Sequence, residues 1–295
     1  MLIGNEPLDL KLTLIDSAQC FRWTEADGRF GCAFEGGPVW LSRTQAGIEA
    51  EGNVDCAALR RYLDLDRDYA GLAGECAHIP AASRAVALMP GLRVLNQPPW
   101  EALICFILSA NNNVARIRGL TDALCRRYGR KWDGEGGALY GFPEPRRLAA
   151  CGEEELRALK VGYRAPFLIE TARRVAEGFP LDALGDMPLD DAHRLLVTLP
   201  GVGDKVADCV LLFGCGHASA FPVDVWVDRL LRDWFGLKCK TRADMAGQAR
   251  ALLGENAGLM QQFLFHAART GAMALDGARR EKSPGRQEIG RGASK

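Results

Sequence analysis

The pattern of apolar residues changes near Pro99, and this change constrains the fold more than any other feature of the chain. Before it, short apolar runs alternate with turn residues, which is typical of antiparallel β-strands. After it, apolar residues recur at helical spacing, and the joints between these segments contain Gly or Pro. The sequence therefore predicts an α+β chain with a small N-terminal antiparallel sheet domain (1–95), an all-helical domain (96–275) and a C-terminal tail (276–295).

The N-terminal part carries strand and hairpin signals. Short strand-like runs occupy 12–15 and 20–23, and Asp27-Gly28 follows between two further apolar runs. Asp-Gly in such a place is a strong signal for a hairpin turn. We therefore expect a sheet of about five antiparallel strands, followed by a helix over 55–65.

The second part reads as a succession of helices. The run over 101–108 is apolar on all sides, which predicts a buried central helix. Helical periodicity and Gly or Pro breaks predict further helices over 117–128, 153–160, 165–177, 189–199, 204–213, 224–235, 241–253 and 258–270.

The charge composition gives a weak argument against a nucleic-acid partner. The chain holds 37 basic and 37 acidic side chains, for a formal net charge of zero, whereas phosphate binding usually leaves a basic surface. A neutral total can still include a basic face. The basic charge is concentrated in 279–295, and the tail is predicted to be disordered.

Ten cysteines are present, but none forms a Cys-x-x-Cys pair, so their spacing supports neither a metal site nor a disulfide framework. Free thiols are typical of a reducing cytosol. The sequence also has no apolar run of membrane-spanning length and no signal segment. We therefore expect a monomeric cytoplasmic protein, nucleoid-associated if its source is bacterial, that uses no metal ion and no cofactor.

A helix-hairpin-helix is predicted where the segment 189–199 ends at Pro200-Gly-Val-Gly203 and a new helix begins at Asp204. Gly201 and Gly203 allow the tight turn because glycine adopts positive φ. The N–H groups at the start of the second helix can then bind a DNA phosphate without sequence preference. Taken alone, the loop is equally compatible with an ordinary helix–helix turn.

Two ionisable residues follow this hairpin. Lys205 lies in the first turn of the second helix, and Asp224 is placed to cap the next one. A lysine amine attacks an anomeric carbon only when neutral, and burial with the positive end of a helix disfavours the ammonium. An ionised Asp224 could stabilise the positive charge that develops as a base departs from its sugar. Taken singly, Lys205 is explained as a solvated helix lysine and Asp224 as an ordinary N-cap. Together with the hairpin, they indicate a catalytic function.

The segment 199–209, followed by Pro222-Val-Asp-Val225, resembles the helix-hairpin-helix DNA glycosylases and most closely their 8-oxoguanine branch. The resemblance extends from Leu8 to about Thr270 through several motifs. It implies base excision repair by a bifunctional enzyme, a DNA glycosylase and apurinic/apyrimidinic lyase that acts on double-stranded DNA containing 8-oxoguanine opposite cytosine. Lys205 would be the nucleophile and Schiff-base residue, and Asp224 the catalytic carboxylate.

An enzyme that extrudes a base must also hold the orphaned partner. The resemblance implies that Asn111 and Arg116 contact the estranged cytosine, that Tyr163 wedges into the base stack and that Arg164 also reads the cytosine. Without it, the asparagines would read as capping residues and Tyr163 as a packed core residue.

The resemblance also assigns a base pocket. Cys209 and Phe265 would enclose the flipped purine, and Gln261 would bond to its Watson–Crick edge. Two positions depart from the family. Ala18 stands on a predicted strand where relatives often have glycine, whose carbonyl distinguishes 8-oxoguanine from guanine, and Trp226 stands where many relatives have histidine. Both leave the reaction class intact but bear on lesion discrimination.

Three other readings remain open. Relatives of endonuclease III and adenine glycosylases usually carry a four-cysteine iron–sulfur cluster near the C-terminus, whereas the last cysteine here is Cys239 and no cluster spacing exists. Glycosylases for alkylated bases normally lack the hairpin lysine, so Lys205 argues against them. A non-enzymatic helix-hairpin-helix DNA-binding module would need the glycines alone.

Overall fold

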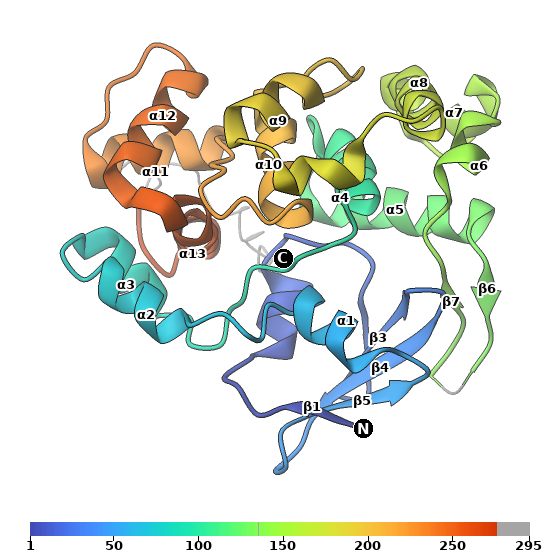
Figure 1. Ribbon diagram of the computed structural model, residues 1–295, viewed down its shortest axis with the longest axis horizontal. Coiled ribbons are helices and arrows are strands. Elements are labelled where there is room, and N and C mark those ends of the chain that lie inside the picture. The colour runs from blue at the N-terminus through green and yellow to red at the C-terminus, as the bar shows by residue number, and fades with distance from the viewer. Residues whose placement is uncertain (135, 276–295) are drawn as a thin grey trace, which may run out of the picture.

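In the computed structural model, which describes residues 1–134 and 136–275, a five-stranded antiparallel sheet lies below a larger set of helices (Figure 1). The strand order is β1-β5-β4-β3-β2. The strands are β1 (Leu2–Gly4), β2 (Thr24–Ala26), β3 (Arg29–Phe34), β4 (Gly37–Arg43) and β5 (Ile48–Gly52). The predicted α+β fold is confirmed. The predicted basic tail, 276–295, lies outside the described residues.

The predicted hairpin is also confirmed. Asp27 and Gly28 both have positive φ, 50° and 73°, and they join β2 to β3. The predicted strands at 12–15 and 20–23 are wrong: Leu12–Asp16 forms a π-helical turn, and 20–23 is unpaired. Local capping favours the turn at 12–16, because the Asp9 carboxylate accepts a hydrogen bond from the Leu12 N–H at 2.9 Å.

The helical part contains every helix that the periodicity predicted beyond Pro99, with shifts of a few residues at the ends. Helices α2, α3 and α6 and the small β6-β7 hairpin were not predicted from the sequence. The remaining elements are α1 (Cys56–Tyr62), α2 (Tyr69–Glu75), α3 (Pro80–Ala87), α4 (Pro99–Ser109), α5 (Val114–Tyr128), β6 (Lys131–Trp132), β7 (Leu139–Tyr140), α6 (Pro145–Ala149), α7 (Glu153–Ala158), α8 (Ala165–Ala176), α9 (Leu189–Leu196), α10 (Asp204–Gly214), α11 (Val225–Phe235), α12 (Arg242–Leu253) and α13 (Ala257–Thr270).

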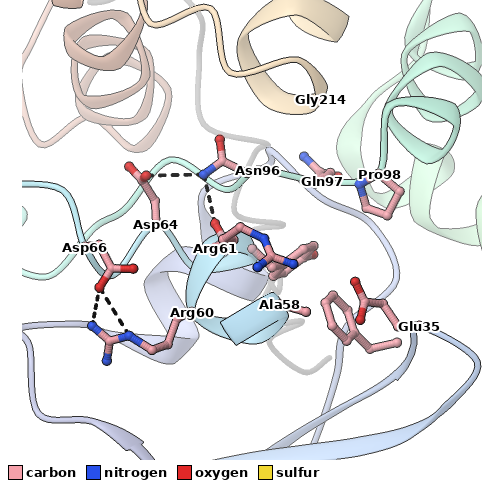
Figure 2. A pocket seen from close by; sticks show the side chains of 12 residues that line it. Glu35, Ala58, Arg60, Arg61, Asp64, Asp66, Asn96, Gln97, Pro98 and Gly214 are labelled. Atoms are coloured by element: carbon pink, nitrogen blue, oxygen red, sulfur yellow. Dashed lines mark hydrogen bonds and ion pairs between the residues drawn. The ribbon is translucent and has the colours of Figure 1, made fainter. Parts of the chain in front are cut away.

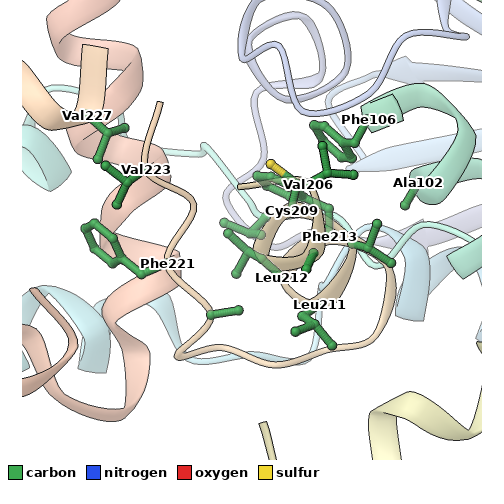
Figure 3. Packing of buried hydrophobic residues seen from close by; sticks show 14 of the residues in the cluster. Ala102, Phe106, Val206, Cys209, Leu211, Leu212, Phe213, Phe221, Val223 and Val227 are labelled. Carbon is green, nitrogen blue, oxygen red and sulfur yellow. The ribbon is translucent and has the colours of Figure 1, made fainter. Parts of the chain in front are cut away.

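The main hydrophobic core is built around α4 and α10 (Figure 3). All residues of 101–108 are buried, as the sequence predicted, and Phe106 stacks on Phe213 of α10 with ring centroids 5.4 Å apart. Helix α3 packs on α13 and so belongs to this core, whereas a second cluster joins the sheet to α1. The division into domains at residue 95 stays a prediction. No helix within the described residues is long and apolar enough to cross a lipid bilayer.

A buried ion pair joins the sheet to the helices. Arg22 Nη1 lies 2.5 Å from Glu101 Oε2 of α4, and the two side chains are only 8% and 5% exposed. Arg22 Nη2 also donates to the carbonyls of Ala33 in β3, at 2.7 Å, and Tyr140 in β7, at 3.1 Å. This single guanidinium therefore links three elements that are distant in the sequence.

Replacing Glu101 with Gln should lower the free energy of unfolding by about 3–5 kcal/mol, because it leaves the Arg22 charge buried without its counterion. Urea denaturation measures the loss. The double variant Arg22→Met/Glu101→Leu should lose less than this, since it removes both charges together. A loss below about 1 kcal/mol for Glu101→Gln would contradict a structural role for the pair.

Candidate active site

Lys205 lies in the first turn of α10 and is half-buried. Its Nζ donates a hydrogen bond to Ser109 Oγ at 2.9 Å and lies 5.2 Å from the centre of the Phe106 ring. Among the described residues, no carboxylate forms an ion pair with it. The end of α4 therefore positions the amine. Sequence reasoning missed Ser109 and Phe106, because nothing local signals a contact across 96 positions.

Asp224 is the N-cap of α11, as expected. Its Oδ1 accepts hydrogen bonds from the N–H groups of Trp226 and Val227, both at 2.9 Å. Its Oδ2 accepts no hydrogen bond from any described residue, so one carboxylate oxygen stays available to a substrate. The Trp226 side chain is half-buried, and the Arg229 guanidinium lies 5.9 Å from its ring.

Cys209 is buried on the same helix as Lys205. It lies one turn beyond Lys205, 3% exposed, and Figure 3 shows it in the packed cluster with Val206 and Phe106. Burial raises the pKa of the Cys209 thiol to about 12; the Lys205 charge opposes this shift and the Asp224 charge adds to it.

Gln261 and Phe265 approach from α13. Gln261 is 4% exposed, and its Nε2 donates to the Pro222 carbonyl at 3.0 Å. Its Oε1 is buried and has no hydrogen-bond partner among the described residues. Phe265 is half-buried. Cys209 and Gln261 are both closed off from solvent, whereas Phe265 is partly accessible.

The turn that contains Ala18 follows the π-helical turn and is not the predicted strand. Ala18 has φ +62°, in the left-handed region that favours glycine, which gives a physical reason for glycine in relatives. Gln262 of α13 donates to the Ser17 carbonyl at 2.8 Å, a contact that sequence reasoning missed. The neighbouring Gln19 side chain is buried and donates to the Arg93 carbonyl at 2.7 Å. The backbone beside Ala18 is therefore held in place.

The consecutive residues Asn111, Asn112 and Asn113 have different roles. Asn112 and Asn113 have the capping and turn roles that these residues commonly take: Asn112 Nδ2 donates to the Leu108 carbonyl at 2.7 Å, and Asn113 caps α5. Asn111 instead has φ +53°, and its Nδ2 donates to the Tyr163 hydroxyl at 3.1 Å. Asn111 is exposed and available to a ligand.

Tyr163 is 49% exposed, so the alternative that it is a packed core residue is wrong. Arg164 differs from the expectation of a free reading residue, because it is 4% exposed. Its guanidinium donates to the carbonyls of Ala110 and Val161 and lies 4.4 Å from the Tyr163 ring. In this state Arg164 therefore supports Tyr163 and anchors the segment that begins at Ala110.

The two hairpin glycines have different roles. Gly201 has φ +80°, as expected, and an added Cβ would lie 2.9 Å from Phe167 Cβ of α8. The predicted positive φ is wrong for Gly203, which is the N-cap of α10 with φ −101°. A Cβ added to Gly203 would meet no atom within 4 Å. Helix α8 also supports the loop, since Thr171 Oγ1 donates to the Pro200 carbonyl at 2.9 Å.

Comparison with known proteins identifies the family. Residues 104–254 match the HhH-GPD superfamily of base excision DNA repair proteins, and residues 1–103 match the N-terminal domain of 8-oxoguanine DNA glycosylase. The chain belongs to the HhH-GPD superfamily. The resemblance to the 8-oxoguanine branch is confirmed by the match over its first 103 residues.

Individual relatives agree with this family. The chain is 36% identical over 204 residues to a probable N-glycosylase/DNA lyase of Methanothermobacter thermautotrophicus, covering 62% of this chain and 65% of the relative. It is 36% identical over 197 residues to the N-glycosylase/DNA lyase of Saccharomyces cerevisiae, covering 61% and 52%. The match thus spans about half to two thirds of these curated relatives.

A solved structure is similar over nearly the whole chain. The Clostridium acetobutylicum 8-oxoguanine glycosylase/lyase, in complex with double-stranded DNA containing cytosine opposite 8-oxoguanine, superposes with a TM-score of 0.84 at 29% identity. The superposition covers 90% of this chain and 93% of that one.

One buried carboxyl group of this HhH-GPD protein was not predicted. Asp208 of α10 is 4% exposed, its Oδ1 has no hydrogen-bond partner among the described residues, and His193 Nε2 of α9 lies 3.9 Å away. Burial raises the Asp208 pKa to about 7; Arg250 opposes the shift, and the charges of Asp204 and Asp190 add to it. An acidic residue within a buried helix segment was the available signal.

The free energy of unfolding should therefore depend on pH through the Asp208 carboxyl, whose contribution should decrease as pH rises. The native pKa of its carboxyl, about 7, exceeds the ordinary value of 3.8, so the native state binds the proton more tightly than the unfolded chain. The carboxyl's contribution to stability is then lost as pH rises between these values. Relative to Asp208→Asn, the wild-type free energy of unfolding should fall between about pH 4 and pH 7. Urea denaturation across this range measures it, and a constant difference would contradict the assignment.

Another cavity lies elsewhere in the molecule. It has a volume of about 470 Å³ and is lined by residues of α1, the 96–98 connection and Gly214 (Figure 2). Arg60 is bonded there to Asp66, and Asn96 to Asp64. None of the residues assigned above to base removal lines it. This cavity is therefore separate from the residues that the sequence assigns to the base pocket.

Proposed function

We propose that this protein excises 8-oxoguanine paired with cytosine from double-stranded DNA and then cleaves the abasic site as a lyase. The observation that carries the proposal is the half-buried Lys205 amine, which donates to Ser109 one helical turn before the buried Cys209. The Asp224 carboxylate, with one oxygen free of hydrogen bonds to described residues, supports it. A DNA-binding module would need none of these groups. The monomeric state and the cytoplasmic location stay predictions.

The chemistry follows from the two ionisable groups. Attack by Lys205 Nζ on C1′ forms a C–N bond while the glycosidic bond to the base breaks, and the base leaves with that electron pair. Asp224, with Oδ2 available, stabilises the positive charge that develops on the sugar. The nitrogen lone pair then displaces O4′ from C1′: the C1′–O4′ bond breaks, O4′ takes up a proton as a hydroxyl, and an imine forms on the opened sugar. Loss of a C2′ proton then expels the 3′ phosphate.

The base pocket would select a purine with donors on its Watson–Crick edge. The buried Gln261 Oε1 lacks a partner, and an N–H of a guanine-type edge would supply one. Cys209 and Phe265 would contact the two faces of the ring. The Ala18 carbonyl would accept the N7 hydrogen that distinguishes 8-oxoguanine from guanine, with the turn held by Gln262.

The opposite strand would meet the exposed groups near the start of α5. Asn111, Arg116 and Tyr163 are all accessible to solvent, and amide and guanidinium donors suit the acceptors on the edge of cytosine. Arg164 would act through Tyr163 and Ala110 while it stays buried. Trp226, beside Asp224, would lie near the backbone of the damaged strand.

Borohydride trapping on a duplex with 8-oxoguanine opposite cytosine should give a covalent adduct with the wild type and none with Lys205→Gln, because glutamine cannot form an imine. Lys11→Gln, a change at an exposed lysine paired with Glu25, serves as the control and should trap normally. An adduct that survives Lys205→Gln would exclude Lys205 as the nucleophile. Equal yields opposite adenine and cytosine would remove the roles of Asn111 and Arg116.

Asp224→Asn should fold and bind DNA normally, since asparagine is an equally good N-cap. Its single-turnover rate of excision should fall at least about 100-fold, because the carboxylate charge that stabilises the transition state is lost. Rapid-quench measurement of excision, together with thermal denaturation, separates the two effects. A wild-type rate in this variant would place Asp224 outside the mechanism.

A further inference from the structure

A second groove lies next to the candidate site, between α5 and the end of α7. Its volume is about 390 Å³, and it is lined by Arg116, Gly119, Leu120, Ala123, Ala158, Leu159 and Lys160. We propose that this α5–α7 groove binds the sugar–phosphate backbone of the undamaged strand next to the estranged cytosine. The inference rests on the proposed function, because it places the groove relative to that cytosine.

The position of the groove supports this occupant. Arg116, the proposed cytosine contact, forms one part of the wall, and its Nη2 donates to the Lys160 carbonyl at 3.2 Å. Tyr163, the proposed wedge, follows Lys160 by three residues and is exposed. A strand whose cytosine meets Arg116 must continue past this wall, since neighbouring phosphates are attached to the same nucleotide.

The chemistry of the lining is complementary to a nucleic-acid backbone. Two exposed cations, Arg116 and Lys160, belong to the lining, and no acidic residue does. Within the described part of the chain neither cation forms an ion pair. The remaining lining residues are apolar or small and offer a surface to deoxyribose, while the cations offer charge to phosphate.

One residue that lines the groove is a glycine that the fold does not require. Gly119 lies in the middle of α5, and an added Cβ would meet no atom within 4 Å. Alanine would stabilise an exposed helix at this position relative to glycine. An added Cβ would fit here, whereas a longer side chain at this lining position would extend into the groove.

Lys160 adds a second indication. Its backbone has φ +65°, in the left-handed region where glycine is favoured, so a lysine here carries conformational strain. The strained peptide presents its carbonyl to Arg116 and leaves the side chain exposed at the groove. Strain of this kind is concentrated at functional sites.

The test is the salt dependence of binding to a duplex with 8-oxoguanine opposite cytosine. Lys160→Gln keeps a side chain on the same strained backbone and removes its charge, with Lys11→Gln as the control. The slope of log Kd against log salt should fall by about one for Lys160→Gln and stay unchanged for Lys11→Gln. Between about 50 and 200 mM salt, the wild type should then lose roughly fourfold more affinity than Lys160→Gln.

Neutral methylphosphonate linkages locate the contact. Placed singly in the undamaged strand beside the cytosine, one of them should weaken binding by the wild type and have no further effect on Lys160→Gln. Gly119→Gln, which fills the groove, should also weaken binding, whereas Gly119→Ala should not. Wild-type affinity and slope for both Lys160→Gln and Gly119→Gln would overturn the proposal, as would sensitivity to methylphosphonates in the damaged strand alone.

The two proposals fail in different ways. If the wild type forms a borohydride adduct while the Lys160 and Gly119 variants bind as it does, only the groove assignment is lost. If no adduct forms, the enzymatic function is lost, and the salt and methylphosphonate measurements still decide whether the groove holds DNA.

Discussion

The packing of α4 against α10 is the interaction on which the rest of the site depends. Both helices bury eight consecutive residues, 101–108 and 206–213, and Phe106 stacks on Phe213 between them. This contact fixes the first turn of α10 over the end of α4, where Ser109 receives the hydrogen bond from Lys205. A reactive amine is thus anchored by the hydrophobic core itself, and among the described residues no carboxylate forms an ion pair with it.

The groups that would contact DNA sit on short strained segments fixed to that core. Ala18, Asn111 and Lys160 all adopt left-handed backbone conformations without being glycine. A side-chain hydrogen bond joins each of these segments to another part of the chain. Gln262 donates to the Ser17 carbonyl beside Ala18, Asn111 donates to the Tyr163 hydroxyl, and Arg116 donates to the Lys160 carbonyl. Strain that the surrounding structure compensates is a means of keeping exposed groups in one geometry.

The sequence predicted the features that depend on local pattern. The helices beyond Pro99, the Asp27-Gly28 hairpin and the N-cap of Asp224 follow from periodicity, turn chemistry and capping. The fold of 12–16 was missed because the capping contact of Asp9 outweighs the apolar pattern. The support of Lys205 by Ser109, the burial of Arg164 and the titration of Asp208 depend on tertiary packing, which no local pattern encodes.

The central claim is that one particular amine performs the chemistry, and mass spectrometry of the trapped complex tests it most directly. Borohydride reduction on 8-oxoguanine DNA, followed by nuclease and protease digestion, leaves a sugar remnant on the lysine that formed the imine. The remnant is predicted on the peptide that contains Lys205, which α4 holds in the site. A remnant on Lys160, on another lysine or on the N-terminal amine would contradict the account.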